Sequence, residues 1–167
     1  MENIEDLYRR YAPAVLRFAA GLTGSLTRAE DIVSETFLRA LVRAPQIRTE
    51  TALAYLLAIA RNTYLSELRR GRPEVQIDED FPAQAADPLD RVAAEAELTR
   101  VRRALLKLPE GERAALLMKA TGDLSYPDIA AALGISVVAA KVRVHRARQR
   151  LASHPSNPPS VQPGELR

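Results

Sequence analysis

Apolar residues recur at helical spacing through the first 70 residues of the chain. A first stripe predicts a helix that ends where Gly21 and Gly24 break it. Thr27 and Glu30 then form a T-x-x-E capping box, which predicts the start of a second helix. A third helix is predicted over residues 52–70 and is apolar over much of its girth. The buried positions predicted for the first two helices are Leu7, Tyr11, Val15, Phe18, Leu22, Ile32, Val33, Thr36, Phe37, Ala40 and Leu41.

The outer side of the second predicted helix combines acidic and aliphatic residues. Asp31, Glu35, Leu38 and Val42 follow one another at i, i+4, i+7 and i+11. A helix face that meets only water rarely carries a leucine and a valine, so the pattern favours a surface on which another helix docks. Packing against another part of this chain would explain the same pattern, and that alternative stays open.

One strip of the third predicted helix is polar. An aromatic ring, an amide and guanidinium groups along one strip can hold unstacked bases and their backbone. Tyr55 also fits the position of a half-buried core residue, so the strip alone does not identify a nucleic-acid site. The residues of the strip and its immediate neighbours are Tyr55, Arg61, Asn62, Ser66, Arg69 and Arg70.

Two short helices around a tight turn are predicted over residues 124–151. Ser125 caps the first of them in an S-x-x-D box, and Gly134 ends it. Ser136 caps the second helix. Its buried stripe is Ala140, Val144, Ala147 and Leu151. This order of caps, stripe and turn predicts a helix-turn-helix unit.

The opposite face of that last helix is basic along both edges. Base edges lie at the floor of a DNA major groove and phosphates line its walls, so basic flanks around a readable centre favour DNA binding. A solvated basic face on an ordinary helical hairpin is the alternative, but five Lys/Arg without an acid favour DNA. The centre comprises Val138, Ala139, Val142, His145, Arg146 and Gln149, and the flanks comprise Lys141, Arg148, Arg143 and Arg150.

Charge is distributed unevenly and divides the chain. Residues 74–97 hold 1 Lys/Arg against 8 Asp/Glu, a net charge of −7, whereas residues 98–167 hold 12 against 5, a net charge of +7. We therefore predict a flexible acidic linker over residues 74–97 between helical domains at residues 1–73 and 98–152. The linker is mainly a solvated spacer, and its charge could also keep the basic unit off nucleic acid. The proline-rich residues 153–167 are predicted to be disordered.

Composition narrows the possible functions. The chain contains no cysteine, and His145 and His154 flank no carboxylate cluster, so we expect no metal site and no cofactor. No acid/base pair, nucleophile motif or phosphate-binding loop indicates an enzyme. No segment approaches a membrane span, and the first ten residues do not form a signal peptide. We therefore expect a cytoplasmic protein without membrane insertion.

Three segments in order resemble one known family. AEDIVSETFLRAL at residues 29–41, AYLLAIARNTYLSELRR at residues 54–70, and LPEGERAALLM at residues 108–118 followed by the helix-turn-helix are similar to the extracytoplasmic-function (ECF) class of bacterial RNA polymerase sigma factors. The resemblance covers residues 7 to about 151. It implies an all-α fold of two small helical domains.

The resemblance also implies partners and residue roles. Such a protein would bind core RNA polymerase, read the minus-thirty-five element as duplex with its helix-turn-helix, and capture a flipped base of the melted minus-ten element. An anti-sigma factor would mask these surfaces. The polymerase clamp would meet Asp31, Ser34, Glu35, Leu38 and Val42. The base pocket would be Arg48, Thr49, Glu50 and Thr51, with Arg61, Asn62, Ser66 and Arg69 on the strand.

Four residues depart from the family pattern. Ser34 stands where glutamine is common and Tyr55 where tryptophan is common. Ala139 and Val142 replace hydroxyl residues at the groove-facing centre, and they offer methyl groups that can pack on a thymine methyl.

Two other classes of protein are alternatives to a sigma factor. A stand-alone helix-turn-helix regulator of the response-regulator type would bind an operator without polymerase. It would also carry a receiver domain with alternating strands and helices, whereas residues 1–73 are predicted to be helical. A helical interaction adaptor would leave the basic helix without a purpose.

Overall fold

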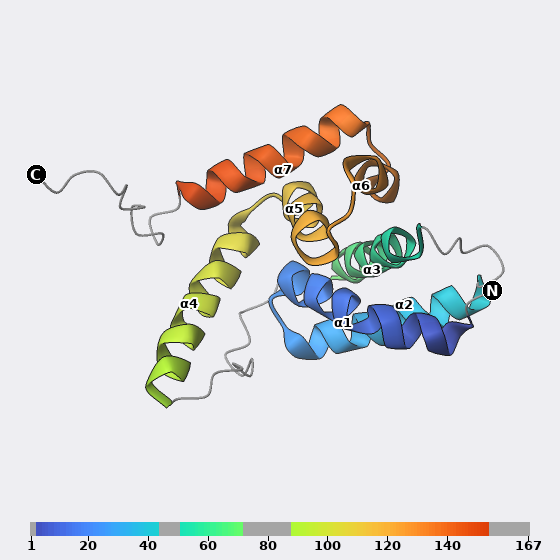
Figure 1. Cartoon of the computed structure of the whole chain (residues 1–167), viewed down its shortest axis with the longest axis horizontal. Helices are drawn as coiled ribbons and strands as arrows, with labels where there is room; N and C mark the ends of the chain where they lie inside the picture. The colour runs from blue at the N-terminus through green and yellow to red at the C-terminus, as the bar shows by residue number, and fades with distance from the viewer. Residues whose placement is uncertain (1–2, 44–50, 72–87, 154–167) are drawn as a thin grey trace, which may run out of the picture.

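The computed structural model describes residues 3–43, 51–71 and 88–153, and every regular element within them is an α-helix (Figure 1). The all-α prediction is therefore confirmed for this part of the chain. The helices are α1 (Ile4–Thr23), α2 (Leu26–Val42), α3 (Ala52–Arg69), α4 (Pro88–Lys107), α5 (Glu110–Gly122), α6 (Tyr126–Leu133) and α7 (Val137–Ala152).

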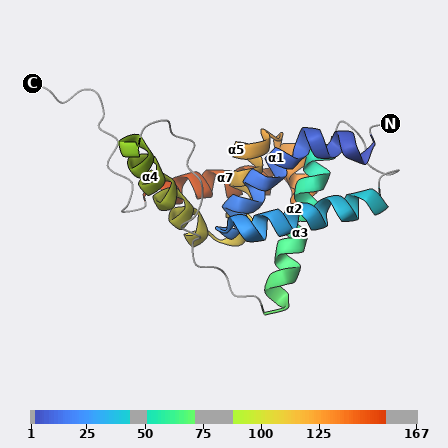
Figure 2. The same ribbon diagram turned by 90° about the horizontal axis from the view of Figure 1, so that it is seen from below.

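The N-terminal unit consists of α1, α2 and α3. Asn3 caps α1 by accepting a hydrogen bond from the Asp6 N–H at 2.9 Å, and α1 ends at Gly24 in the left-handed conformation. Figure 2 shows α3 crossing α1 and α2 steeply. Phe18, Ile32 and Leu57 are among the fully buried residues where the three helices meet. Burial of such side chains stabilises the unit by roughly 1.5–3 kcal/mol each.

Two details of α2 differ from the prediction. The cap of α2 is Ser25, not Thr27, because the Thr23 hydroxyl accepts from the Ser25 N–H and fixes the chain reversal two residues earlier. Leu41 is 51% exposed although it was predicted to be buried. Tyr8 contacts Phe37 near the start of α1, so Leu41, one turn beyond Phe37, lies at the open end of the helix pair.

Gly21 does not break α1, and that prediction is wrong. It remains helical, and a Cβ placed on it would lie 2.6 Å from Leu117 Cδ2 of α5. The missing side chain therefore serves a close approach between two helices that are distant in sequence.

The segment expected to be a linker is helical in its second part. α4 begins at Pro88, ten residues before the predicted start of the C-terminal domain. Alanine, glutamate and leucine are strong helix formers, and proline is tolerated in a first turn. The helix carries no continuous apolar stripe, and Val92 is exposed, so apolar periodicity did not indicate it. Residues 74–87 of the predicted linker and residues 154–167 of the predicted tail lie outside the described residues.

The caps predicted for α6 and α7 are confirmed. The Ser125 hydroxyl accepts from the Asp128 N–H at 3.2 Å, and the Ser136 hydroxyl accepts from the Ala139 N–H at 3.1 Å. Gly134 ends α6 with a φ of 66°, a conformation that L side chains rarely adopt. Ala140, Val144 and Ala147 are fully buried, and Leu151 packs against the same core.

The two helical units pack on each other. α5 and α6 lie between α7 and the N-terminal helices, and α7 is on the outside of the molecule (Figure 1). A single hydrophobic core runs from Phe18 in α1 through Met118 in α5 to Val144 in α7. This packing places one candidate surface in the open and another against the neighbouring unit.

Candidate nucleic-acid and partner interfaces

The outward face of α7 is open to solvent. Ser136 fixes the residue at which α7 begins, and burial of Ala140, Val144 and Ala147 in the core fixes the rotation of the helix. The opposite side consequently carries the six predicted central residues. Of these, Ala139 is partly buried and the others are exposed: Val138, Val142, His145, Arg146 and Gln149.

The basic residues of α7 are not equivalent. Arg146 and Arg148 are exposed, and the Lys141 ammonium lies 5.8 Å from the ring centroid of Tyr126 in α6. The Arg143 guanidinium is packed against α5, since a Cβ on Gly111 would lie 2.7 Å from its Nη1 atom. Arg150 Nε lies 2.9 Å from Glu112 Oε2. One flank therefore leans on α5, and the other is available to meet phosphates.

The outer line of α2 is also exposed. Leu38 is 60% exposed and Val42 is 83% exposed, while Asp31 and Ser34 face solvent. No part of the described chain covers the two aliphatic side chains, so packing within this part of the chain does not explain the line. Glu35 forms an i, i+4 ion pair with Arg39 at 2.8 Å, and both side chains remain partly exposed.

A hollow of about 590 Å³ lies beside this line, between α1 and α2. Its walls include Tyr8, Leu16 and Val33, and Ser34 joins it to the exposed line. An apolar depression next to exposed aliphatic residues is suited to receive side chains of a docking helix.

The predicted polar strip of α3 is divided by the packing of the two units. Arg61 turns to α5, where its Nε and Nη2 atoms donate to the two carboxylate oxygens of Glu110, each at 2.7 Å. Arg69 donates to the Ser66 hydroxyl at 3.1 Å, and Asn62 is exposed. Tyr55 is half-buried against the core, as the alternative interpretation of that residue anticipated.

A second hollow, of about 380 Å³, lies between the end of α2 and α3. Asn62 and Ile59 of α3 line it together with Arg39, Val42 and Arg43 of α2. The two arginines were not predicted as part of the site. Their i, i+4 spacing immediately before the predicted base-pocket loop was the available signal.

Arg48, Thr49 and Glu50 of the predicted base pocket lie outside the described residues. Thr51, the fourth residue of that pocket, is exposed at the start of α3. The hollow between α2 and α3 is lined by Arg43, the last described residue before this segment, and by Ile59, about two turns into α3.

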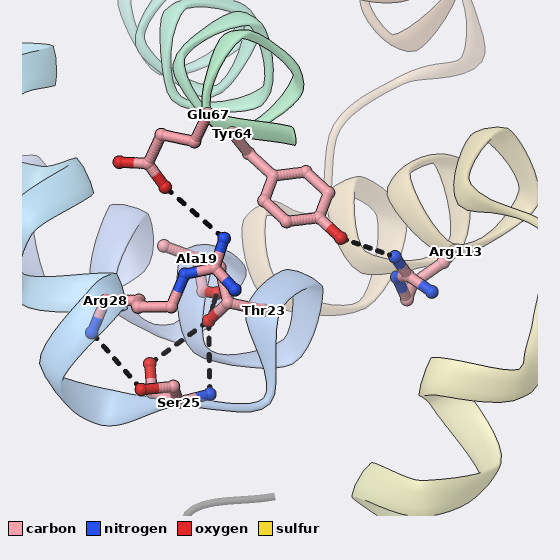
Figure 3. A network of polar contacts seen from close by, with 7 residues as sticks. All are labelled: Ala19, Thr23, Ser25, Arg28, Tyr64, Glu67 and Arg113. Atoms are coloured by element: carbon pink, nitrogen blue, oxygen red, sulfur yellow. Dashed lines mark hydrogen bonds and ion pairs between the residues drawn. The ribbon is translucent and has the colours of Figure 1, made fainter. Parts of the chain in front are cut away.

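A buried arginine connects the two units. Arg113 of α5 donates to the Tyr64 hydroxyl of α3 at 3.1 Å and to the Leu106 and Leu108 carbonyl oxygens at 3.2 Å. Figure 3 shows Tyr64 and Arg113 pointing toward each other across the contact, with the Arg28 and Glu67 pair beside them. A guanidinium presents several donors in a fixed plane and therefore restricts the orientation of α5 against α3.

Comparison with known proteins identifies the two units. Sigma-70 region 2 matches residues 7–74, and sigma-70 region 4 matches residues 98–151. The ECF RNA polymerase sigma factor EcfG of Rhodopseudomonas palustris (strain TIE-1) is 35% identical over 153 residues, which are 91% of this chain and 84% of that protein.

Two solved structures are similar in fold. One is the sigma factor RpoE in complex with the anti-sigma factor NepR from Bartonella quintana, with a TM-score of 0.73, 26% identity, and coverage of 88% of this chain and 92% of that one. The other is CnrH in complex with the cytosolic domain of CnrY, with a TM-score of 0.65, 29% identity, and coverage of 89% and 84%.

A helical unit with an exposed acidic and aliphatic line on α2, joined to a helix-turn-helix unit with an open basic face on α7, is typical of a DNA-binding transcription protein. The chain belongs to the ECF class of the sigma-70 family of RNA polymerase sigma factors. It binds core RNA polymerase and directs promoter-specific initiation of transcription, as the sequence resemblance predicted. A stand-alone regulator is not favoured, because the N-terminal unit is sigma-70 region 2. None of the helices described at residues 3–43, 51–71 and 88–153 is long and apolar enough to cross a membrane.

Proposed function

We propose that the chain divides sigma-factor activity among three surfaces, and that α2 is the one that docks on core polymerase. Asp31, Ser34, Glu35, Leu38 and Val42 form this docking line. The exposure of Leu38 and Val42 supports the assignment. Burying two exposed aliphatic side chains under a partner helix removes apolar surface from water and so favours binding. The adjoining hollow between α1 and α2 gives that partner a place to insert side chains.

The second surface is the end of α2 with the outer side of α3, which we assign to the melted minus-ten strand. Asn62, Arg39 and Arg43 line one hollow there, so an amide and two cations converge on a space in which a base and its phosphate can lie. The strand residues are Arg61, Asn62, Ser66 and Arg69, and the base pocket is formed by Arg48, Thr49, Glu50 and Thr51.

The third surface is the open face of α7, which we assign to the minus-thirty-five duplex. Arg146, His145 and Gln149 reach base edges from the centre of the face. Lys141 and Arg148 lie at the free flank, where phosphates pass, and Arg143 lies on the flank that leans on α5. Val138, Ala139 and Val142 complete the centre.

An anti-sigma factor is proposed as the regulatory partner. One similar structure contains a sigma factor bound to the anti-sigma factor NepR, and the other contains CnrH bound to the cytosolic domain of CnrY. The exposed line of α2 and the hollow beside it are surfaces that such a partner could cover in competition with polymerase. We further propose that residues 1–73 and 98–152 act as two domains in the cytoplasm and that the chain performs no chemistry of its own.

The observation that carries the proposal is the presence, on one chain, of an uncovered docking line on α2 and an uncovered basic face on α7. Run-off transcription with purified core polymerase, with and without this protein, tests it. We expect promoter-dependent transcripts only when the protein is present. Sequence-specific binding to DNA without polymerase, combined with no promoter-dependent transcript, would instead identify a stand-alone regulator.

A further inference from the structure

The first two turns of α7 present almost no hydrogen-bonding side chain to the groove-facing side. Residues 137–144 read VVAAKVRV. The two polar residues in this stretch lie at the flanks, Lys141 beside the Tyr126 ring and Arg143 against Gly111. The Ser136 hydroxyl accepts the capping hydrogen bond from the Ala139 N–H. The remaining side chains of this part of the helix are aliphatic.

Two of these aliphatic side chains are adjacent on the open face. Val138 is 71% exposed and Val142 is 38% exposed, and their i, i+4 spacing places them on one side of the helix. Ala140 and Val144 are buried, so the core does not require the exposed pair to be apolar. Exposed cations stand farther along the same face at Arg146 and on its flank at Arg148.

Position along the helix determines which partner fits the valine pair. In helix-turn-helix proteins the first residues of the second helix are those that reach base edges in the major groove. In that groove the only apolar group on a base edge is the C5 methyl of thymine. A cytosine amine at the same place would lose its water without gaining an acceptor, which is unfavourable.

We propose that Val138 and Val142 read thymine methyl groups in the upstream promoter element, whereas Arg146 and its polar neighbours read the adjacent base pairs by hydrogen bonds. The inference rests on the proposed function of α7 and adds the chemical class of base that each half of the face selects. The cations along the face favour DNA over an apolar protein partner as the occupant of this surface.

Base analogues test the proposal one methyl group at a time. The preferred upstream duplex is first selected from a randomised library with the holoenzyme reconstituted from core polymerase and the full chain. Each thymine is then replaced singly by deoxyuridine, which lacks only the methyl group. We expect one or two positions at which this replacement weakens binding about fourfold, the equivalent of about 0.8 kcal/mol for one buried methyl-sized group.

Two additional arms connect those positions to particular residues. Val142→Ala or Val138→Ala should remove the deoxyuridine effect at one position each, while Arg146→Ala should leave both effects intact. Alanine is a stronger helix former than valine, so neither variant should unfold α7. At the same positions, 5-methylcytosine should bind more tightly than cytosine. The matched control is Val92→Ala, which truncates a valine on α4 that is 67% exposed, close to the 71% of Val138.

Each outcome decides between the inference and the proposed function. Selective binding that is insensitive to deoxyuridine at every position would overturn the methyl assignment and leave the promoter-reading role intact. Failure of the holoenzyme to select any upstream sequence would overturn the role of α7 itself. If the valine variants bind DNA as the parent does but lose affinity for a protein partner, the valine pair belongs to a protein interface and the proposal is wrong.

Discussion

We assign both the open face of α7 and the polar strip of α3 to promoter DNA, yet the two surfaces differ in how far the rest of the chain covers them. α7 lies on the outside of the molecule, and nothing in the described chain covers its centre. α3 faces α5 and α6 along part of its length, and Glu110 holds the Arg61 guanidinium with two hydrogen bonds of 2.7 Å. The face of α7 is therefore accessible to DNA in this arrangement, whereas Arg61 of the α3 strip is already paired with Glu110.

The two promoter elements lie farther apart than the packed molecule can reach. Their names place them about 25 base pairs apart, or roughly 85 Å of B-form DNA at about 3.4 Å per step. A folded unit of about 150 residues has a radius of gyration of only about 15 Å. A packed arrangement of that size is too small to meet both elements, so we expect the contact between the two units to open when the promoter is engaged.

The largest expected effect concerns the buried arginine at that contact. Arg113→Leu removes the donor from the Leu106 and Leu108 carbonyl oxygens and from the Tyr64 hydroxyl. Two buried hydrogen bonds and one partly buried hydrogen bond are then lost, so we expect the free energy of unfolding to fall by about 3 kcal/mol. Urea denaturation of the full chain measures the change. Arg103→Leu, at an exposed position on α4, is the control, and a loss below about 0.5 kcal/mol for Arg113→Leu would show that the contact does not stabilise the fold.

The docking line of α2 gives the next effect in size. Glu35→Arg combined with Leu38→Asp reverses one charge and places another in the apolar part of the line. Binding to core polymerase, measured by titration, should weaken at least tenfold, since truncating or reversing groups at an interface centre removes well over 1.4 kcal/mol. Helicity should change little, because Leu38 is exposed and Glu35 is partly exposed, so neither side chain belongs to the core. Val92→Asp with Glu95→Arg on α4 provides the matched control, and equal binding by both double variants would exclude α2 as the docking surface.

A smaller effect is expected for Asn62, which lines the hollow between α2 and α3. Asn62→Ala should reduce open-complex formation on a duplex promoter about fivefold, the equivalent of one hydrogen bond of about 1 kcal/mol. The loss should be less on a template with a pre-melted bubble, because the flipped base is already available there. Permanganate footprinting of both templates measures it, with Thr27→Ala as control. Equal losses on the two templates would place Asn62 in folding rather than in strand capture.

The smallest change is expected for Glu110→Gln, which loosens the hold on Arg61. The apparent affinity for a single-stranded minus-ten oligonucleotide is proportional to the fraction of molecules in which the strand surface is available. Releasing Arg61 should therefore tighten binding about threefold, as measured by fluorescence anisotropy. Glu95→Gln changes the net charge equally and should have little effect. No difference between the two variants would mean that Glu110 does not limit access to Arg61.

The contrast between local and distant interactions also explains what the sequence could predict. Ser125, Gly134 and Ser136 act on neighbours within four residues, and their caps were predicted correctly together with the buried stripe of α7. Gly21 and Arg61 act through α5, whose contacting residues Leu117 and Glu110 are distant in the sequence. The spacing of apolar residues along one helix does not indicate which residues of a distant helix will contact it. The same limit applies to Leu41, whose exposure depends on where α1 begins.

We expect the packed arrangement of the two units to open when the promoter is bound. The chain has no cysteine, so Thr27→Cys on α2 and Ala131→Cys on α6, both at exposed positions, can carry a single pair of spin labels. Double electron–electron resonance on the free protein should give one short distance. In the complex with core polymerase and promoter DNA, that distance should increase by several tens of ångströms, as expected from the roughly 85 Å between the elements. An unchanged distance in a transcriptionally active complex would contradict the account.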